Sequence, residues 1–92
     1  MDSQKRAALR KIGHPMRPLM RLGNKGLTEA FAKELSSSLK AHQLVKVRLD
    51  VSAGAEARAR AEEIATQAEA EVVDVVGAVG LFYREDPEDP LV

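Results

Sequence analysis

Cysteine and tryptophan are absent from this sequence of 92 residues, and only Phe31, Phe82 and Tyr83 are aromatic. Without cysteine the chain has no disulfide, no thiolate metal ligand and no thiol nucleophile, so it must fold by packing alone, as suits a reducing cytosol. Three aromatic residues are too few for the stacking platform that an RNA recognition motif builds on its sheet. These absences exclude a disulfide-rich module and argue against an aromatic RNA-binding sheet.

Long apolar runs are missing as well. The longest apolar stretch in the sequence is a few residues, whereas roughly 20 are needed to span a bilayer. The N-terminal segment MDSQKRAALRK lacks the apolar core of a signal peptide. We therefore expect a soluble, cytoplasmic protein with no membrane partner. The length and the 45% hydrophobic content fit one domain, which we place at residues 1–84. Residues 85–92 form an acidic, proline-punctuated tail that we expect to be disordered.

A net charge is also missing, because 14 basic and 14 acidic residues cancel. Residues 1–48 nevertheless hold 11 basic and 3 acidic residues, a net charge of +8, and the remainder carries −8. Between Lys5 and Lys25 there are seven basic residues and no acidic one. Such a bias can produce a positive face for an anionic partner, although an ordinary solvated helix surface gives the same pattern.

Apolar periodicity and capping residues predict seven elements in the order α-β-α-β-α-β-β. Helices are expected at about 3–12, 29–41 and 55–70, and strands at about 19–22, 44–51, 72–76 and 79–84. Gly13 is expected to end the first helix as a C′ glycine, and Thr28 to cap the second. Strand-helix-strand units give parallel neighbours and the final hairpin adds an antiparallel pair. The fold class is therefore mixed α/β (α+β), with a mixed four-stranded sheet covered by helices.

The segment Gly23-Asn24-Lys25-Gly26, here called the GxxG loop, joins a predicted strand end to a predicted helix start. Two glycines allow close backbone approach, and free amides at a helix N-terminus favour phosphate. KH domains clamp nucleotides with a GxxG loop, but a tight turn without a ligand has the same pattern. Nearby basic residues favour phosphate binding: Arg17, Arg21, and, on the polar face of the strand 44–51, Lys46 and Arg48.

No pattern predicts catalysis, a metal site or a cofactor. His14 and His42 are too isolated for zinc, which needs three or four ligands. We expect His42 at a helix end or core edge, whereas His14 either orders the connector around it or contacts a phosphate. The serines at 36–38 lie on a predicted helix without a strained nucleophile turn. The sequence therefore predicts a protein that is not an enzyme.

The run from His14 to Glu29, HPMRPLMRLGNKGLTE, closely resembles the signature of the CRM domain, the stand-alone bacterial YhbY family of RNA-binding proteins. The resemblance covers about residues 5–84, with further matches at Leu39, His42, Leu44, 45–48, Gly77 and 81–84. It implies a fold similar to the C-terminal domain of translation initiation factor 3, with RNA bound by the GxxG loop and adjacent basic surface. It also implies association with precursors of the large ribosomal subunit.

The expected RNA-binding residues are Arg17, Arg21, Gly23, Asn24, Lys25, Gly26, Lys46, Arg48 and Lys11. Our hypothesis is a monomeric, non-catalytic module that holds phosphates of ribosomal RNA during large-subunit assembly. The alternative is a protein-interaction module that docks on a ribosomal protein or assembly factor through the acidic face of the helix 55–70. A small phosphoesterase acting on RNA ends is a third hypothesis, and it predicts turnover of labelled RNA.

Overall fold

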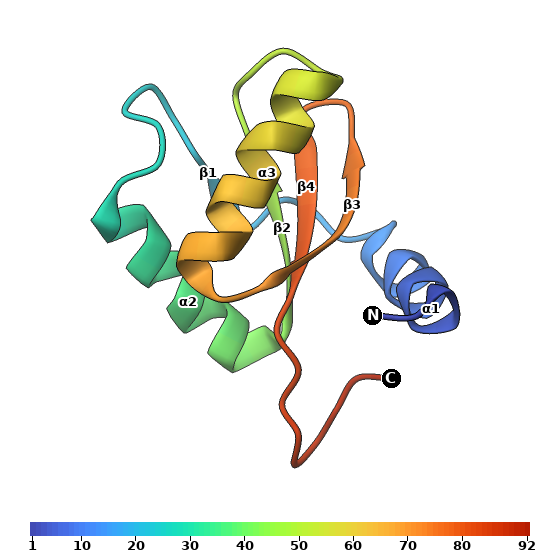
Figure 1. Ribbon diagram of the computed structural model, residues 1–92. Helices are drawn as coiled ribbons and strands as arrows, with labels where there is room; N and C mark the ends of the chain where they lie inside the picture. Colours follow the sequence, from blue (N-terminus) through green and yellow to red (C-terminus); the bar gives the residue numbers. More distant parts are fainter.

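The computed structural model describes all 92 residues and contains three helices and four strands (Figure 1). In chain order these are α1 (Ser3–Gly13), β1 (Met20–Arg21), α2 (Glu29–His42), β2 (Leu44–Arg48), α3 (Ala55–Ala68), β3 (Glu71–Val76) and β4 (Val79–Tyr83). The predicted order of elements is confirmed. No helix among the three combines the length and the apolar character needed to cross a membrane.

The four strands form one sheet in the order β1-β2-β4-β3. β1 is parallel to β2, and β4 is antiparallel to both of its neighbours. The predicted mixed sheet is therefore confirmed. Parallel neighbours were expected from both strand-helix-strand units, and this is right for β1 and β2 but wrong for β2 and β3, because β4 lies between them.

Capping residues set the start of two helices. The side chain of Asp2 accepts a hydrogen bond from the amide of Lys5 at 2.7 Å, and that of Thr28 accepts one from the amide of Phe31 at 3.1 Å. Both bonds satisfy amides that have no partner within the helix. α3 begins after Gly54 without a side-chain cap, so it relies on its alanine, glutamate and arginine residues, which favour helix.

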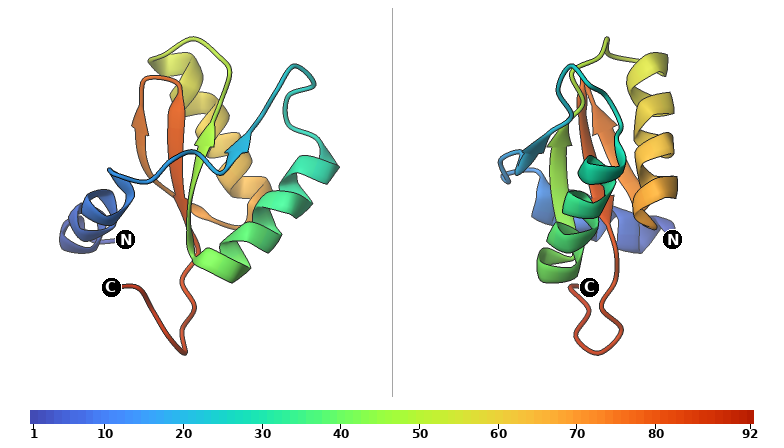
Figure 2. Two further views of the ribbon diagram at one scale, coloured as in Figure 1. Left: turned by 180° about the vertical axis from the view of Figure 1, so that it is seen from behind. Right: turned by 90° about the vertical axis from the view of Figure 1, so that its left-hand side faces the viewer.

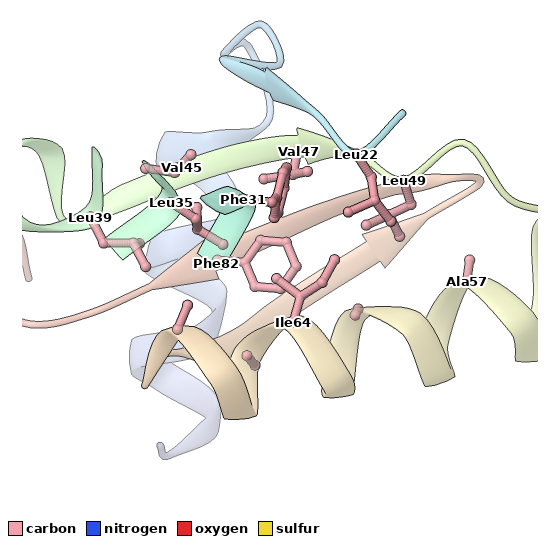
Figure 3. Close-up of a cluster of buried hydrophobic side chains, with 13 residues drawn as sticks. Leu22, Phe31, Leu35, Leu39, Val45, Val47, Leu49, Ala57, Ile64 and Phe82 are labelled. Atoms are coloured by element: carbon pink, nitrogen blue, oxygen red, sulfur yellow. The ribbon is translucent and has the colours of Figure 1, made fainter. Parts of the chain in front are cut away.

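Helices α2 and α3 pack on one face of the sheet, and α3 crosses in front of the strands in Figure 1. The main core lies between them and the sheet, with Phe82 between Ile64 of α3 and Leu35 of α2 (Figure 3). α3 contributes four buried alanines to this core: Ala57, Ala61, Ala65 and Ala68. Side chains of this size let the helix lie close to the sheet.

A second, smaller core lies on the opposite face under α1, and its members are Leu9, Leu44, Val73, Leu81 and Tyr83. Phe82 and Tyr83 are both buried because successive residues of a strand point to opposite faces and both faces are covered here. The sequence predicts that the face of β2 that carries Lys46 is exposed to solvent along its whole length. At the Leu44 end it is covered by α1, and only its other end is open.

Seen from behind, the connector between α1 and β1 crosses the sheet, while α1 stands at the β3 side (Figure 2, left). We call the part of this face outside the second core the outer face. Strand register and side-chain alternation give its members: Arg21, Lys46, Arg48, Asp74, Val76 and Val79.

Gly13 has a different role from the one predicted. It is the last residue of α1, it is buried, and its φ is not among the positive values found at four other glycines. A Cβ atom added to Gly13 would lie only 2.5 Å from Cδ2 of Leu81. Glycine at this position therefore lets α1 approach β4, and a side chain here would force the buried Leu81 to shift.

The acidic tail turns back toward Gln43. The Gln43 side chain donates to the carbonyl of Asp89 at 2.7 Å and accepts from the amide of Asp86 at 3.1 Å. Lys5 and Glu85 form an ion pair of 2.6 Å. The tail lies at the end of the molecule opposite the GxxG loop (Figure 1). Its expected disorder stays a prediction.

Candidate functional site

The GxxG loop connects β1 to α2 at the open end of the sheet (Figure 1, upper left). Gly23 and Gly26 have φ values of 78° and 69°, which side chains disfavour, and the amide of Gly26 donates to the carbonyl of Gly23 at 3.3 Å. Asn24 and Lys25 are exposed, and their amides form no hydrogen bond within the chain. The loop therefore presents two adjacent N–H groups and one lysine to solvent.

Asp50 ties the start of this loop to the sheet. Its Oδ2 accepts from Nε of Arg21 at 2.6 Å and from the amide of Gly23 at 3.2 Å. The residue has a φ of 54°, a left-handed value that aspartate tolerates better than most residues. The amide of Gly23 is thus not available to a ligand, because a carboxylate of the chain already binds it.

The hydrogen bond from the Arg21 guanidinium holds the pKa of the Asp50 carboxyl below its ordinary value, and the amide of Gly23 acts in the same direction. A carboxyl whose pKa is lower in the folded state stabilises the fold above its unfolded pKa, near 3.9. That contribution is lost as the pH falls through the lower, folded pKa.

We therefore expect Asp50→Asn, which keeps the left-handed preference, to lower the thermal midpoint at neutral pH and to match the wild type in strong acid. The difference should shrink below about pH 4. Thermal unfolding followed by circular dichroism from neutral pH into acid measures it. A difference that stays constant over this range would mean that the carboxylate charge does not hold the loop.

Cations surround the GxxG loop on several sides. Arg21 and Arg48 are direct cross-strand partners on the outer face, and both are exposed. From α3, the guanidinium of Arg60 approaches the loop: a Cβ atom built on Gly26 would lie 3.7 Å from its Nη1. The three ion pairs of the structure leave Lys25, Arg48 and Arg60 unpaired. This arrangement can hold an anion such as a phosphate by amides and charge together.

The model of the CRS1/YhbY (CRM) domain family matches residues 1–84. The chain belongs to the CRM domain family. A relative in Pseudomonas aeruginosa, named Probable RNA-binding protein PA4753, is 30% identical over 88 residues, which cover 96% of this chain and 85% of the relative. A Haemophilus influenzae relative, named RNA-binding protein, is 28% identical over 91 residues, which cover 96% and 89%.

The solution structure of the hypothetical protein SAV1595 from Staphylococcus aureus is similar to this CRM domain, with a TM-score of 0.83. The two chains are 24% identical, and the alignment covers 94% of this chain and 90% of the other. The likeness shows that the two share a fold. The resemblance to the CRM domain that the sequence signature indicated is thus confirmed.

Not all of the predicted site residues lie at the GxxG loop of this CRM domain. Nζ of Lys46 donates to the carbonyls of His14 and Met16 at 3.2 and 2.9 Å, so Lys46 fixes the connector across the sheet. Arg17 lines a groove together with Leu44. Leu44 lies at the opposite end of β2 from Arg48, about 14 Å away at 3.4 Å per residue. A role of these residues in binding RNA, and of the exposed Lys11 on α1, stays a prediction.

The sequence did not predict that Asp50 and Arg60 lie at the GxxG loop of the CRM domain. It also did not predict the role of Arg6, whose side chain reaches β3. Alternation along 44–51 predicts Asp50 on the polar strand face with Lys46 and Arg48, which gives no sign of a bond to the loop. Arg60 lies in the acidic half of the chain, where nothing in the pattern distinguishes it from a solvated helix charge. Arg6 was counted as part of the basic run. Its Nη1 instead donates to the carbonyls of Val72 and Val73, both at 2.8 Å, where the pairing of β3 is irregular.

Proposed function

We propose that this protein binds RNA, and that the GxxG loop with the neighbouring arginines holds the phosphates. The observation that carries the proposal is the convergence of two unbonded amides, at Asn24 and Lys25, with unpaired cations from β2 and α3. Backbone amides and guanidinium groups are common phosphate ligands in nucleic-acid complexes. The names of the two CRM-domain relatives support RNA as the source of those phosphates.

Phosphate contacts give affinity without sequence information, so the affinity should depend strongly on salt. With about three to five phosphates engaged at roughly −0.7 per contact, log affinity against log salt has a slope of about −2 to −4. Arg21 contributes less than its charge suggests, because Asp50 already neutralises it. A flat salt dependence would contradict the phosphate mechanism.

The finer proposal is that the RNA is ribosomal, in precursors of the large subunit, and that the protein acts in the cytoplasm as a monomer without catalysis. It is supported by the signature that resembles stand-alone bacterial YhbY proteins. Crosslinking in cells followed by sequencing of the attached RNA tests it. We expect enrichment at one region of large-subunit RNA, and diffuse messenger RNA would contradict this role.

Nuclease treatment of sedimented ribosomal particles separates this proposal from protein docking. If the protein binds RNA, its association with the particles should be lost when the RNA is digested. A protein complex that survives digestion would indicate docking instead, with the acidic exposed side of α3 as the candidate surface. Incubation of purified protein with end-labelled RNA should show no turnover.

A further inference from the structure

A groove of about 390 Å³ lies between the end of α1 and the outer face of the sheet. Arg10 and His14 line it from α1 and its end, and Lys46, Asp74, Val76 and Val79 line it from the sheet. This volume is within the range of small-molecule sites, about 300 to 1,000 Å³. Of the expected RNA-binding residues only Lys46 lines this groove, and its Nζ already donates to the carbonyls of His14 and Met16.

The lining combines apolar side chains of the sheet with basic side chains from α1 and β2. Val76 is 68% exposed although it lies in a strand, so its side chain has no covering partner in the chain. Arg10 is exposed and takes part in none of the ion pairs. Asp74 is the only carboxylate of the lining, and its Oδ1 accepts from the amide of Val75 at 3.0 Å, which leaves Oδ2 for another donor.

Strand register places this groove next to the arginines of the outer face. Arg21 pairs with Arg48 across β1 and β2, Arg48 with Val79 across β2 and β4, and Val79 with Val76 across β4 and β3. Neighbouring strands are about 4.8 Å apart, so Val79 lies about 10 Å from the strand of Arg21. An RNA strand held by phosphate at Arg21 and Arg48 can therefore reach the mouth of the groove.

We infer that the groove receives an unpaired base of the bound RNA. The lining has no phenylalanine, tyrosine or tryptophan, and its planar side chains are the guanidinium of Arg10 and the imidazole of His14. We assign the stacking surface to Arg10, with the two valines contacting the base from the sheet. Asp74 can accept a hydrogen bond from an exocyclic amino group, as acidic residues do from cytosine. This inference rests on the proposed function and adds base recognition to phosphate binding.

The test compares a single-stranded RNA with an abasic strand that has the same number of phosphates. The wild-type protein should bind the base-containing strand about tenfold more tightly, near the lower end of the factor of about 5 to 150 that a base gains by stacking on an aromatic side chain. Arg10→Lys keeps the charge and removes the planar group. It should reduce the preference to about twofold and leave the abasic affinity and its salt slope unchanged. Arg58→Lys, at an exposed arginine of α3, is the matched control and should change neither affinity.

Equal affinity of the wild type for both strands would overturn the inference, while salt-dependent binding of the abasic strand would keep the proposed phosphate site. A preference that Arg10→Lys leaves intact would also overturn it, because the base would then bind elsewhere. If neither strand binds, the proposed function fails and the inference fails with it. Circular dichroism of both variants confirms that each measurement is made on folded protein.

Discussion

Replacing Lys25 and Arg48 together with glutamate should lower the affinity for single-stranded RNA about 30-fold at roughly 0.1 M salt. Both side chains are exposed and unpaired. Lys25 lies in the GxxG loop, and Arg48 pairs across the strands with Arg21, just before the loop. Each lost phosphate contact removes about 0.7 from the salt slope, which is a factor of about 5 at this concentration, and repulsion by the new carboxylates adds to it. Fluorescence anisotropy with labelled RNA over a salt series measures both quantities. The slope should become less negative by about 1.4.

The matched control is the pair Lys33→Glu and Lys40→Glu on α2, which makes the same change in net charge at exposed positions. It also removes the exposed Lys33–Glu29 ion pair of 3.3 Å, so circular dichroism is used to confirm that the variant is folded. We expect its affinity to fall no more than about threefold, because charges beyond a Debye length of about 10 Å are largely screened. Equal losses in the two variants would show that net charge alone decides binding. Arg21 is unsuitable for this test, since its replacement would leave Asp50 without a partner.

The elements that the sequence predicted well are those with local signals. Thr28 bonds the amide of Phe31 three residues later, and the alternation of Val45 and Val47 with Lys46 needs only the geometry of a strand. The alanine stripe of α3 likewise indicated a close approach to the sheet, which the buried Ala61 confirms. Each of these signals lies within one element, so no knowledge of its neighbours is required.

The features that the sequence could not predict depend on contacts between distant residues. β4 lies between β2 and β3, and glycine matters at position 13 only because Leu81 approaches there. For the site, the proximity of Arg60 to Gly26 comes from the packing of α3 and has no counterpart in local pattern. The GxxG loop was visible because its two glycines and its flanking signature are contiguous.

The charge split of the chain does not map onto one positive and one negative face. Lys5, Arg6 and Lys46 belong to the basic half, but their charged groups bind Glu85 or backbone carbonyls. Conversely, Asp50 and Arg60 come from the acidic half and meet at the GxxG loop. The cations available to a phosphate are therefore fewer than the count of +8 suggests, and one of them comes from the other half of the chain.

Phe82→Ala should lower the free energy of unfolding by about 3–5 kcal/mol, the usual loss for a phenylalanine removed from a core. Phe82 is fully buried at the centre of the main core, between α2 and α3. At about 0.05–0.15 kcal/mol per residue the whole domain has a stability of only about 5–14 kcal/mol. A large fraction of the Phe82→Ala molecules is therefore expected to unfold at moderate temperature. Urea unfolding of the variant measures the loss.

Phe82→Leu is the control, because it keeps most of the volume and should lose less than about 1.5 kcal/mol. A loss below about 1 kcal/mol for Phe82→Ala would contradict the packing of both helices on this face. Phe82 points away from Arg48 and the outer face, since Phe82 and Val79 lie on opposite faces of β4. Folded Phe82→Leu should therefore bind RNA as tightly as the wild type, which separates the layer that holds the fold together from the layer that meets the ligand.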